Sequence, residues 1–231
     1  MPSIHKLRLR TGKAVKNICL INGSLRGKEA SSLAFLEDVN RKLPDTEYDK
    51  TFLTVRARLK GGYPQDMLRS MAAADSIIMV FPLFSYGLPG ALTRFLEDYY
   101  RYVQAGNGYN KDAGVYIIVN CGFPRPRTIT EAVRVIKNFC RRLSLNWRFA
   151  ICIGSGPVVV AVKKVPLLHM KLKRAYSDIA SDIKNGDRAV KGDYFIKPIL
   201  PEPIILMIKN QFEKKMRLAD EKSKDEKGSL E

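Results

Sequence analysis

The sequence predicts an α/β fold built on a doubly wound, five-stranded parallel sheet. Short runs of apolar and β-branched residues alternate with segments whose apolar residues recur at helical spacing, as far as residue 183. The strand runs are apolar throughout instead of alternating, so helices are expected to cover both faces of the sheet. Right-handed crossovers between parallel strands then favour a doubly wound topology.

Four of the predicted strands are apolar runs closed by a glycine or a proline, and residues 48–55 alternate enough to be a further strand. The strands are expected at residues 15–22, 48–55, 76–81, 115–121 and 147–153. The helices are expected at residues 31–43, 67–74, 91–103, 129–143 and 167–183. Five strands with this spacing fit the flavodoxin-like order 2-1-3-4-5, in which ligands bind beyond the carboxyl ends of strands 1 and 3. The loops after Asn22, Phe81 and Asn120 are therefore where a site is expected.

The length of 231 residues predicts one core with an extension. Residues 1–186 form the flavodoxin-like domain, and residues 187–231 form a C-terminal helical extension that is not an independent domain. Residues 186–203 are broken by glycine and proline, which predicts a loop or a short strand. Residues 204–222 predict an amphipathic helix that packs on the domain or on a second copy, with an anionic membrane surface as the alternative. Its apolar face carries Ile204, Ile205, Ile208, Phe212 and Met216.

The formal net charge of +17 favours anionic ligands, nucleic acid or an anionic surface. The basic excess concentrates in residues 1–16 and 125–148. No RNP, zinc-finger or helix-turn-helix pattern accompanies it, so sequence-specific nucleic-acid binding is not expected. No run approaches the roughly 18 apolar residues of a membrane span, and residues 1–16 lack the apolar region of a secretory signal. A cytoplasmic location is expected.

The positions of the cysteines and histidines argue against a metal site and against histidine catalysis. The four cysteines, at positions 19, 121, 140 and 152, form no CxxC pair, so neither a metal site nor an iron–sulfur cluster is expected. They are interpreted as reduced thiols. The two histidines, His5 and His169, lie outside the three loops, which argues against histidine acid–base catalysis. No catalytic side chain is predicted.

The first loop, residues 23–32, reads GSLRGKEASS and leads from a strand into a helix. A phosphate placed there would meet backbone N–H groups, the positive end of a helix dipole, hydroxyl donors and the Arg26 guanidinium. Ser31 or Ser32 could instead serve as the N-cap of the helix. The loop is neither a Walker A motif nor GxGxxG, so ATP and a Rossmann-type NAD site are disfavoured.

Three loops together resemble those of the NAD(P)H-dependent FMN reductase family of flavodoxin-like proteins. The first is Gly-Ser-x-Arg followed by a pair of serines, directly after strand 1. The second, after strand 3, is Phe81-Pro82-Leu83-Phe84-Ser85-Tyr86-Gly87, followed by a pattern similar to that of the family up to Asp98. The third, after strand 4, is Asn120-Cys121-Gly122-Phe123-Pro124. Phe84 and Arg94 depart from the tyrosine and lysine that are usual in the family.

The resemblance implies a bound FMN, with NAD(P)H as the reductant. The first loop would hold the phosphate, the second would lie along the ring and ribityl chain, and the third would border the ring. No catalytic side chain is implied, because hydride chemistry takes place on the flavin. The implied cofactor-binding residues are Ser24, Arg26, Ser31, Ser32, Pro82, Leu83, Phe84, Ser85, Tyr86, Gly87, Asn120, Cys121, Gly122 and Phe123.

The leading functional hypothesis is an NAD(P)H-dependent flavin oxidoreductase that reduces a quinone, a flavin, a nitroaromatic compound or a similar small acceptor. A homodimer is expected, because the family builds its site partly from a neighbouring subunit. Two alternatives remain open. One is a flavin-binding electron carrier without NAD(P)H activity, and the other is a scaffold or membrane-surface protein that keeps the fold without the cofactor.

Overall fold

The computed structural model describes residues 9–10, 13–26, 30–55, 62–162, 164–186, 191–198, 201, 203–205, 207 and 210–211. Its centre is a parallel sheet in the order β4-β3-β5-β6-β7-β8, and a separate two-stranded sheet, β1-β2, lies near the amino terminus. The strands are β1 (Leu9–Arg10), β2 (Lys13–Ala14), β3 (Lys16–Asn22), β4 (Tyr48–Thr54), β5 (Ser76–Pro82), β6 (Gly114–Asn120), β7 (Asn146–Ile153) and β8 (Tyr194–Ile196).

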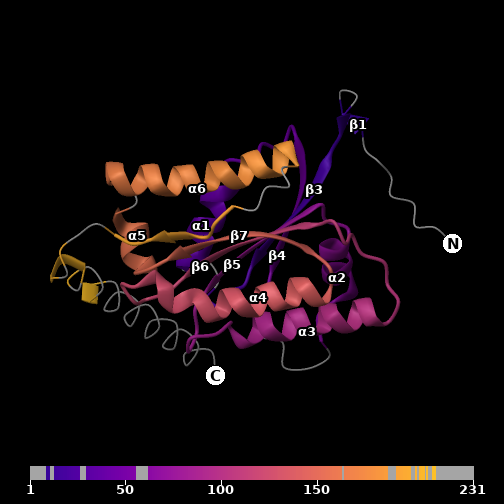
Figure 1. The fold of residues 1–231 in the computed structure, drawn as a ribbon, viewed down its shortest axis with the longest axis horizontal. Helices are drawn as coiled ribbons and strands as arrows, with labels where there is room; N and C mark the ends of the chain where they lie inside the picture. The colour runs from indigo at the N-terminus through magenta and orange to yellow at the C-terminus, as the bar shows by residue number, and fades with distance from the viewer. Residues whose placement is uncertain are drawn as a thin grey trace, which may run out of the picture.

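Helices connect the strands and cover both faces of the sheet (Figure 1). The predicted alternation of strands and helices is confirmed, and the ends of the elements differ from prediction by a few residues. A 3₁₀ helix, η2, forms the turn before α4. The helices are α1 (Ser31–Asn40), α2 (Gln65–Ala72), α3 (Gly90–Gln104), η2 (Pro126–Ile129), α4 (Thr130–Arg142), α5 (Gly156–Val162) and α6 (Pro166–Asn185).

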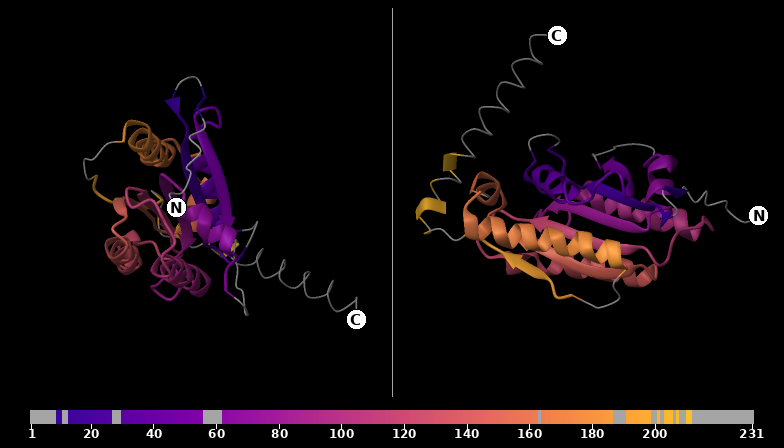
Figure 2. Two further views of the ribbon diagram at one scale, coloured as in Figure 1. Left: turned by 90° about the vertical axis from the view of Figure 1, so that its right-hand side faces the viewer. Right: turned by 90° about the horizontal axis from the view of Figure 1, so that it is seen from above.

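The predicted order 2-1-3-4-5 is confirmed for the first five strands of the main sheet, but a sixth strand corrects the strand count. β8 pairs in parallel with β7, with Cys152 opposite Phe195 and Ile153 opposite Ile196. β8 lies at the outer edge of the sheet, beside β7 (Figure 2). β8 lies within residues 186–203, where the sequence predicts a loop or a short strand, and three residues carry too little periodicity to choose between the two. The strand pairs with the edge of β7.

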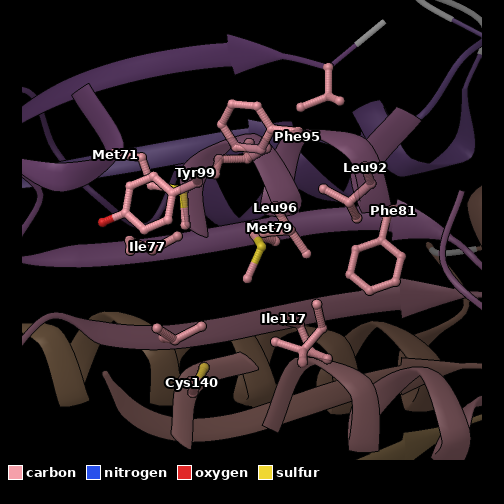
Figure 3. Packing of buried hydrophobic residues seen from close by; sticks show 14 of the residues in the cluster. Met71, Ile77, Met79, Phe81, Leu92, Phe95, Leu96, Tyr99, Ile117 and Cys140 are labelled. Carbon is pink, nitrogen blue, oxygen red and sulfur yellow. The ribbon is translucent and has the colours of Figure 1, made fainter. Parts of the chain in front are cut away.

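Two hydrophobic clusters fill the spaces between the sheet and its helices. One contains residues of α2, α3 and α4, and the other contains residues of α1, α5 and α6. In the first, Phe95 and Tyr99 of α3 lie close to Ile77 and Met79 of β5 (Figure 3). Continuous burial of β5 and β6 on both faces explains why their sequences are apolar throughout.

A buried ion pair joins the sheet to α6, which packs in the second cluster. The Arg148 side chain donates two hydrogen bonds to the Asp182 carboxylate, with Nε 2.7 Å from Oδ2 and an Nη nitrogen 2.8 Å from Oδ1. The Tyr116 hydroxyl donates to the same carboxylate at 2.7 Å. These three residues, which we name the interior cluster, join β6, β7 and α6. Burial and the bond to Asp182 raise the pKa of Tyr116.

The C-terminal segment is described only in part. Of the predicted helix at residues 204–222, residues 204, 205, 207, 210 and 211 are helical, and Ile204 and Met207 are exposed. The rest of its apolar face, at positions 208, 212 and 216, lies outside the described residues. Among the helices that the structure describes, none has the length and apolar character needed to cross a bilayer.

Candidate functional site

The three loops singled out from the sequence lie at one edge of the sheet. β3, β5 and β6 are consecutive neighbours and all parallel, so the segments that follow Asn22, Pro82 and Asn120 leave the sheet on the same side. Five of the eight buried polar or charged residues in the described part of the chain gather there. We name them the carboxyl-edge cluster: Asn22, Ser24, Ser32, Asn120 and Ser155.

The first loop is shaped by side chains that bind its own backbone. The Oδ1 atom of Asn22 accepts the N–H of Ser24 at 3.0 Å, and the Oγ atom of Ser24 accepts the N–H of Arg26 at 3.3 Å. A Cβ at Gly23 would lie 2.9 Å from the Cβ of Phe81, so only glycine fits against β5 here. The Ser24 hydroxyl proton is not used by these bonds, and it can be donated to a ligand.

Among the residues that the structure describes, none caps the start of helix α1 with its side chain. Its N-cap residue is Ala30, which provides no side-chain hydrogen bond, and its first turn contains no acidic residue. The interpretation of Ser31 or Ser32 as an N-cap is therefore wrong: both lie inside the helix, where their hydroxyls do not cap its first N–H groups. Such an end attracts an anion, because the first N–H groups lack intrahelical partners and the helix dipole is positive there.

Ser32 and Asn120 connect the first loop to the third. The Ser32 hydroxyl donates to Oδ1 of Asn120 at 2.9 Å, and both residues are buried. The proton of Ser32 is therefore held by Asn120, whereas Ser31 is half-buried at the helix end. Arg26 is exposed and pairs with no carboxylate among the described residues. Ser24, Arg26 and Ser31 are therefore placed to contact a ligand directly. Ser32 instead orients Asn120.

The second loop is a tight turn with strained central residues. Phe84 and Gly87 exchange both backbone hydrogen bonds, at 3.0 and 2.8 Å, around Ser85 and Tyr86. Ser85 has φ 46° and Tyr86 has φ 62°, in the left-handed region that side chains other than glycine seldom adopt. Phe84 and Tyr86 are 63% and 60% exposed, so this strained turn holds two aromatic rings in solvent.

Two contacts join the third loop to the second. Leu83 donates its N–H to the carbonyl of Asn120 at 2.7 Å. The rings of Tyr86 and Phe123 stack with their centroids 5.7 Å apart and an interplanar angle of 13°. The second and third loops thus hold a stacked pair of aromatic rings at the carboxyl edge, the same edge of the sheet at which α1 begins.

Cys121 is buried at the start of the third loop. Its Sγ atom lies 3.4 Å from the carbonyl oxygen of Phe123 and 3.6 Å from Oγ1 of Thr128. The other three thiols lie in the core, where burial raises the pKa values of Cys19, Cys140 and Cys152 to about 12. These three thiols are therefore neutral at physiological pH and are poor nucleophiles.

Ser155 also lies at this edge, because it follows the end of β7, although it is not among the predicted site residues. It follows β7 with φ 50°, it is 2% exposed, and its hydroxyl has no hydrogen-bond partner among the described residues. Its N–H donates to the carbonyl of Phe123 at 2.7 Å, and the N–H of Gly156 donates to the carbonyl of Cys121 at 2.8 Å. Backbone strain and an unsatisfied buried hydroxyl in one residue are typical of a functional site.

A separate cavity of about 470 Å³ opens between α3 and α4. Leu96 and Phe139 are among its lining residues, and none of the predicted site residues lines it. Its lining comes from α3, from α4 and from Leu88, so it lies between two helices and not within the three loops. The convergence of uncapped N–H groups, hydroxyls and aromatic rings therefore places the candidate site at the loops and not in this cavity.

Comparison with known proteins supports the fold. No family model matches the chain, and no curated protein matches it. Among solved structures, the apo form of an NADH:FMN oxidoreductase is similar over 73% of this chain and 90% of its own, with a TM-score of 0.56 and 13% identity. An NADPH-quinone reductase from P. pentosaceus has a TM-score of 0.54 and 14% identity, over 72% of this chain and 98% of its own.

A third similar structure was solved with its cofactor. It is general stress protein 14 from Treponema denticola in complex with FMN, and it has a TM-score of 0.52 and 14% identity over 74% of this chain and 99% of its own. These proteins share the arrangement of a parallel sheet between layers of helices. The chain therefore has the flavodoxin-like fold.

Proposed function

We propose that this chain is an NAD(P)H-dependent flavin oxidoreductase that binds FMN at the carboxyl edge of its sheet. The observation that carries the proposal is the start of α1, preceded by Ser24 and Arg26 and lacking a side-chain cap from Ala30, at the same edge of the sheet as the stacked rings of Tyr86 and Phe123. A phosphate suits the first feature and a flat heteroaromatic ring suits the second. The similar solved structures, named for FMN and quinone chemistry, support the same reading.

In this proposal the first loop binds the phosphate. Ser24 donates its free hydroxyl proton, Arg26 supplies the positive charge, and Ser31 together with the first N–H groups of α1 completes the donor set. Ser32 does not contact the phosphate in this proposal, because its hydroxyl donates to Asn120. That hydrogen bond links the first loop to the third.

The second and third loops position the ring. In this proposal both loops would border the ring together, because Tyr86 and Phe123 stack on each other. The residues involved would be Pro82, Leu83, the Phe84–Gly87 turn, Asn120, Cys121, Gly122 and Phe123. FMN supplies the ring that takes up a hydride from NAD(P)H and passes on reducing equivalents. The protein contributes binding, orientation and a stacking surface. The acceptor that we propose is a quinone, a flavin, a nitroaromatic compound or a similar small molecule.

The assembly and location are part of the same proposal. We infer a homodimer in the cytoplasm, where four reduced cysteines are ordinary, and all four are free in the structure.

Two measurements on the purified full chain test the function. FMN is added, and binding is followed by the shift of the flavin absorption bands and by calorimetry, with one FMN expected per chain. NADH and NADPH are then titrated anaerobically, and bleaching of the flavin band is expected. Flavin that binds but is not bleached indicates the electron carrier instead. An absence of FMN binding by both methods contradicts the cofactor assignment.

A further inference from the structure

An arginine–proline–arginine turn follows the third loop. Arg125 and Arg127 are exposed, whereas Pro126 between them is buried. The hydroxyl of Thr128 donates to the carbonyl of Arg125 at 2.8 Å, and the hydroxyl of Thr130 donates to the carbonyl of Arg127 at 2.7 Å. A buried proline and two hydroxyl bonds fix the backbone, so both cations extend from a rigid base.

This turn crosses the end of the sheet. The 3₁₀ helix η2, which contains Arg127, contacts β6, β7 and β8. The Arg127 guanidinium lies over the ring of Phe195 in β8, 5.3 Å from its centroid. Since adjacent strands lie about 4.8 Å apart, β8 is about 10 Å from β6, where the third loop begins. The two arginines thus extend the candidate site sideways along the carboxyl edge.

Neither cation is neutralised by the described part of the protein. Arg94 and Arg101 pair with Asp98, Arg134 pairs with Glu131, and Arg148 pairs with Asp182. No described carboxylate pairs with Arg125 or Arg127. Two unneutralised guanidinium groups on a rigid turn favour a phosphate, whose oxygens accept their paired N–H groups.

We propose that Arg125 and Arg127 bind a phosphate of the reducing dinucleotide, an inference that rests on the proposed function. A quinone or a nitroaromatic compound carries no phosphate with which the two guanidinium groups could pair. A dinucleotide whose nicotinamide lies at the third loop is long enough to reach both arginines. Its phosphate groups are the pyrophosphate, present in NADH and NADPH, and the 2′-phosphate, present only in NADPH.

Calorimetry on the full chain tests this without relying on turnover. The probes are adenosine 2′,5′-bisphosphate, ADP and adenosine. The variant is Arg125→Ala with Arg127→Ala, and the control is Arg141→Ala with Arg142→Ala, which removes the same charge at the opposite end of α4. The test variant is expected to lose about 10- to 100-fold in affinity for a phosphorylated probe. The control is expected to retain wild-type affinity.

The choice of probe identifies the phosphate. A loss confined to adenosine 2′,5′-bisphosphate assigns the arginines to the 2′-phosphate and predicts a preference for NADPH. An equal loss for ADP assigns them to the pyrophosphate and predicts no preference. The variant Arg125→Lys with Arg127→Lys is expected to keep part of the affinity, since it keeps the charge but loses the paired geometry.

Three results would overturn the proposal: no binding of either phosphorylated probe to the wild type, unchanged affinity in the test variant, or an equal loss in the control. Retention of FMN by the test variant is checked by absorbance, which shows that its site is intact. Failure of the wild type to bind FMN would contradict the proposed function instead, and the calorimetric result for the phosphorylated probes would be read independently of it.

Discussion

Two groups of buried polar residues in this molecule differ in how completely they are satisfied. In the interior cluster, the Asp182 carboxylate accepts bonds from Arg148 and Tyr116, which leaves a closed set of partners. In the carboxyl-edge cluster, the Ser155 hydroxyl has no partner within the described part of the chain, and Ser24 keeps a donor that none of its hydrogen bonds there uses. Burial of polar atoms is common to both groups, so burial alone does not mark a site.

Backbone strain separates the same two regions. Three of the four described non-glycine residues with positive φ, namely Ser85, Tyr86 and Ser155, lie in loops at the carboxyl edge. The interior cluster lies within regular strands and a helix. Strain and unsatisfied groups persist only where the surrounding structure enforces them, and they are typical of ligand sites. We therefore expect mutations in the interior cluster to change stability, and mutations at the carboxyl edge to change binding.

The largest effect is expected inside the molecule. Asp182→Ala leaves the buried Arg148 guanidinium without its carboxylate, and the free energy of unfolding should fall by about 3–5 kcal/mol. Urea denaturation measures the loss. Glu131→Ala, which breaks an exposed ion pair with Arg134 at 3.2 Å, is the control and should cost no more than about 1 kcal/mol. Similar losses in the two variants would show that the interior cluster is not the stabilising feature inferred here.

At the first loop, a smaller effect is expected, and it should change FMN affinity instead of stability. Arg26→Ala should weaken FMN binding by about 10- to 100-fold, because a hydrogen bond to a charged group contributes about 1.5–3 kcal/mol. Its free energy of unfolding should change by no more than about 0.5 kcal/mol, since Arg26 is exposed. Arg134→Ala removes the same charge elsewhere and should leave FMN affinity unchanged. Equal affinity in the two folded variants would place the phosphate away from Arg26.

The sequence predicted the sheet because its strands are continuous apolar runs and its helices have regular spacing. It did not predict α5 as a helix. Val158 and its β-branched neighbours have little helix propensity, and the helix forms where the chain packs against α1. The stacking of Tyr86 on Phe123 and the isolation of the Ser155 hydroxyl depend on loops that are distant in the chain. No local pattern carries that information.

The backbone of the second loop provides the finest test of the contrast between the two regions. Ser85 and Ser144 both adopt positive φ, 46° and 54°, but Ser85 lies in the candidate site and Ser144 follows α4 at the other end of the sheet. Glycine adopts these angles without a steric cost, although it also gives the unfolded chain more freedom. Each change to glycine should therefore alter the free energy of unfolding by less than about 1 kcal/mol, in the same direction.

Binding should distinguish these two serines. Ser85→Gly frees a residue that must be ordered again around the ligand, and ordering one residue costs on the order of 1 kcal/mol, so FMN affinity should fall by about fivefold. Ser144→Gly should leave FMN affinity unchanged, because it frees a turn that no ligand contacts. Fluorescence titration of FMN quenching resolves a fivefold difference. If the affinities of the two variants agree, the strain at Ser85 does not organise the site, and the positive φ there reflects only the geometry of a tight turn.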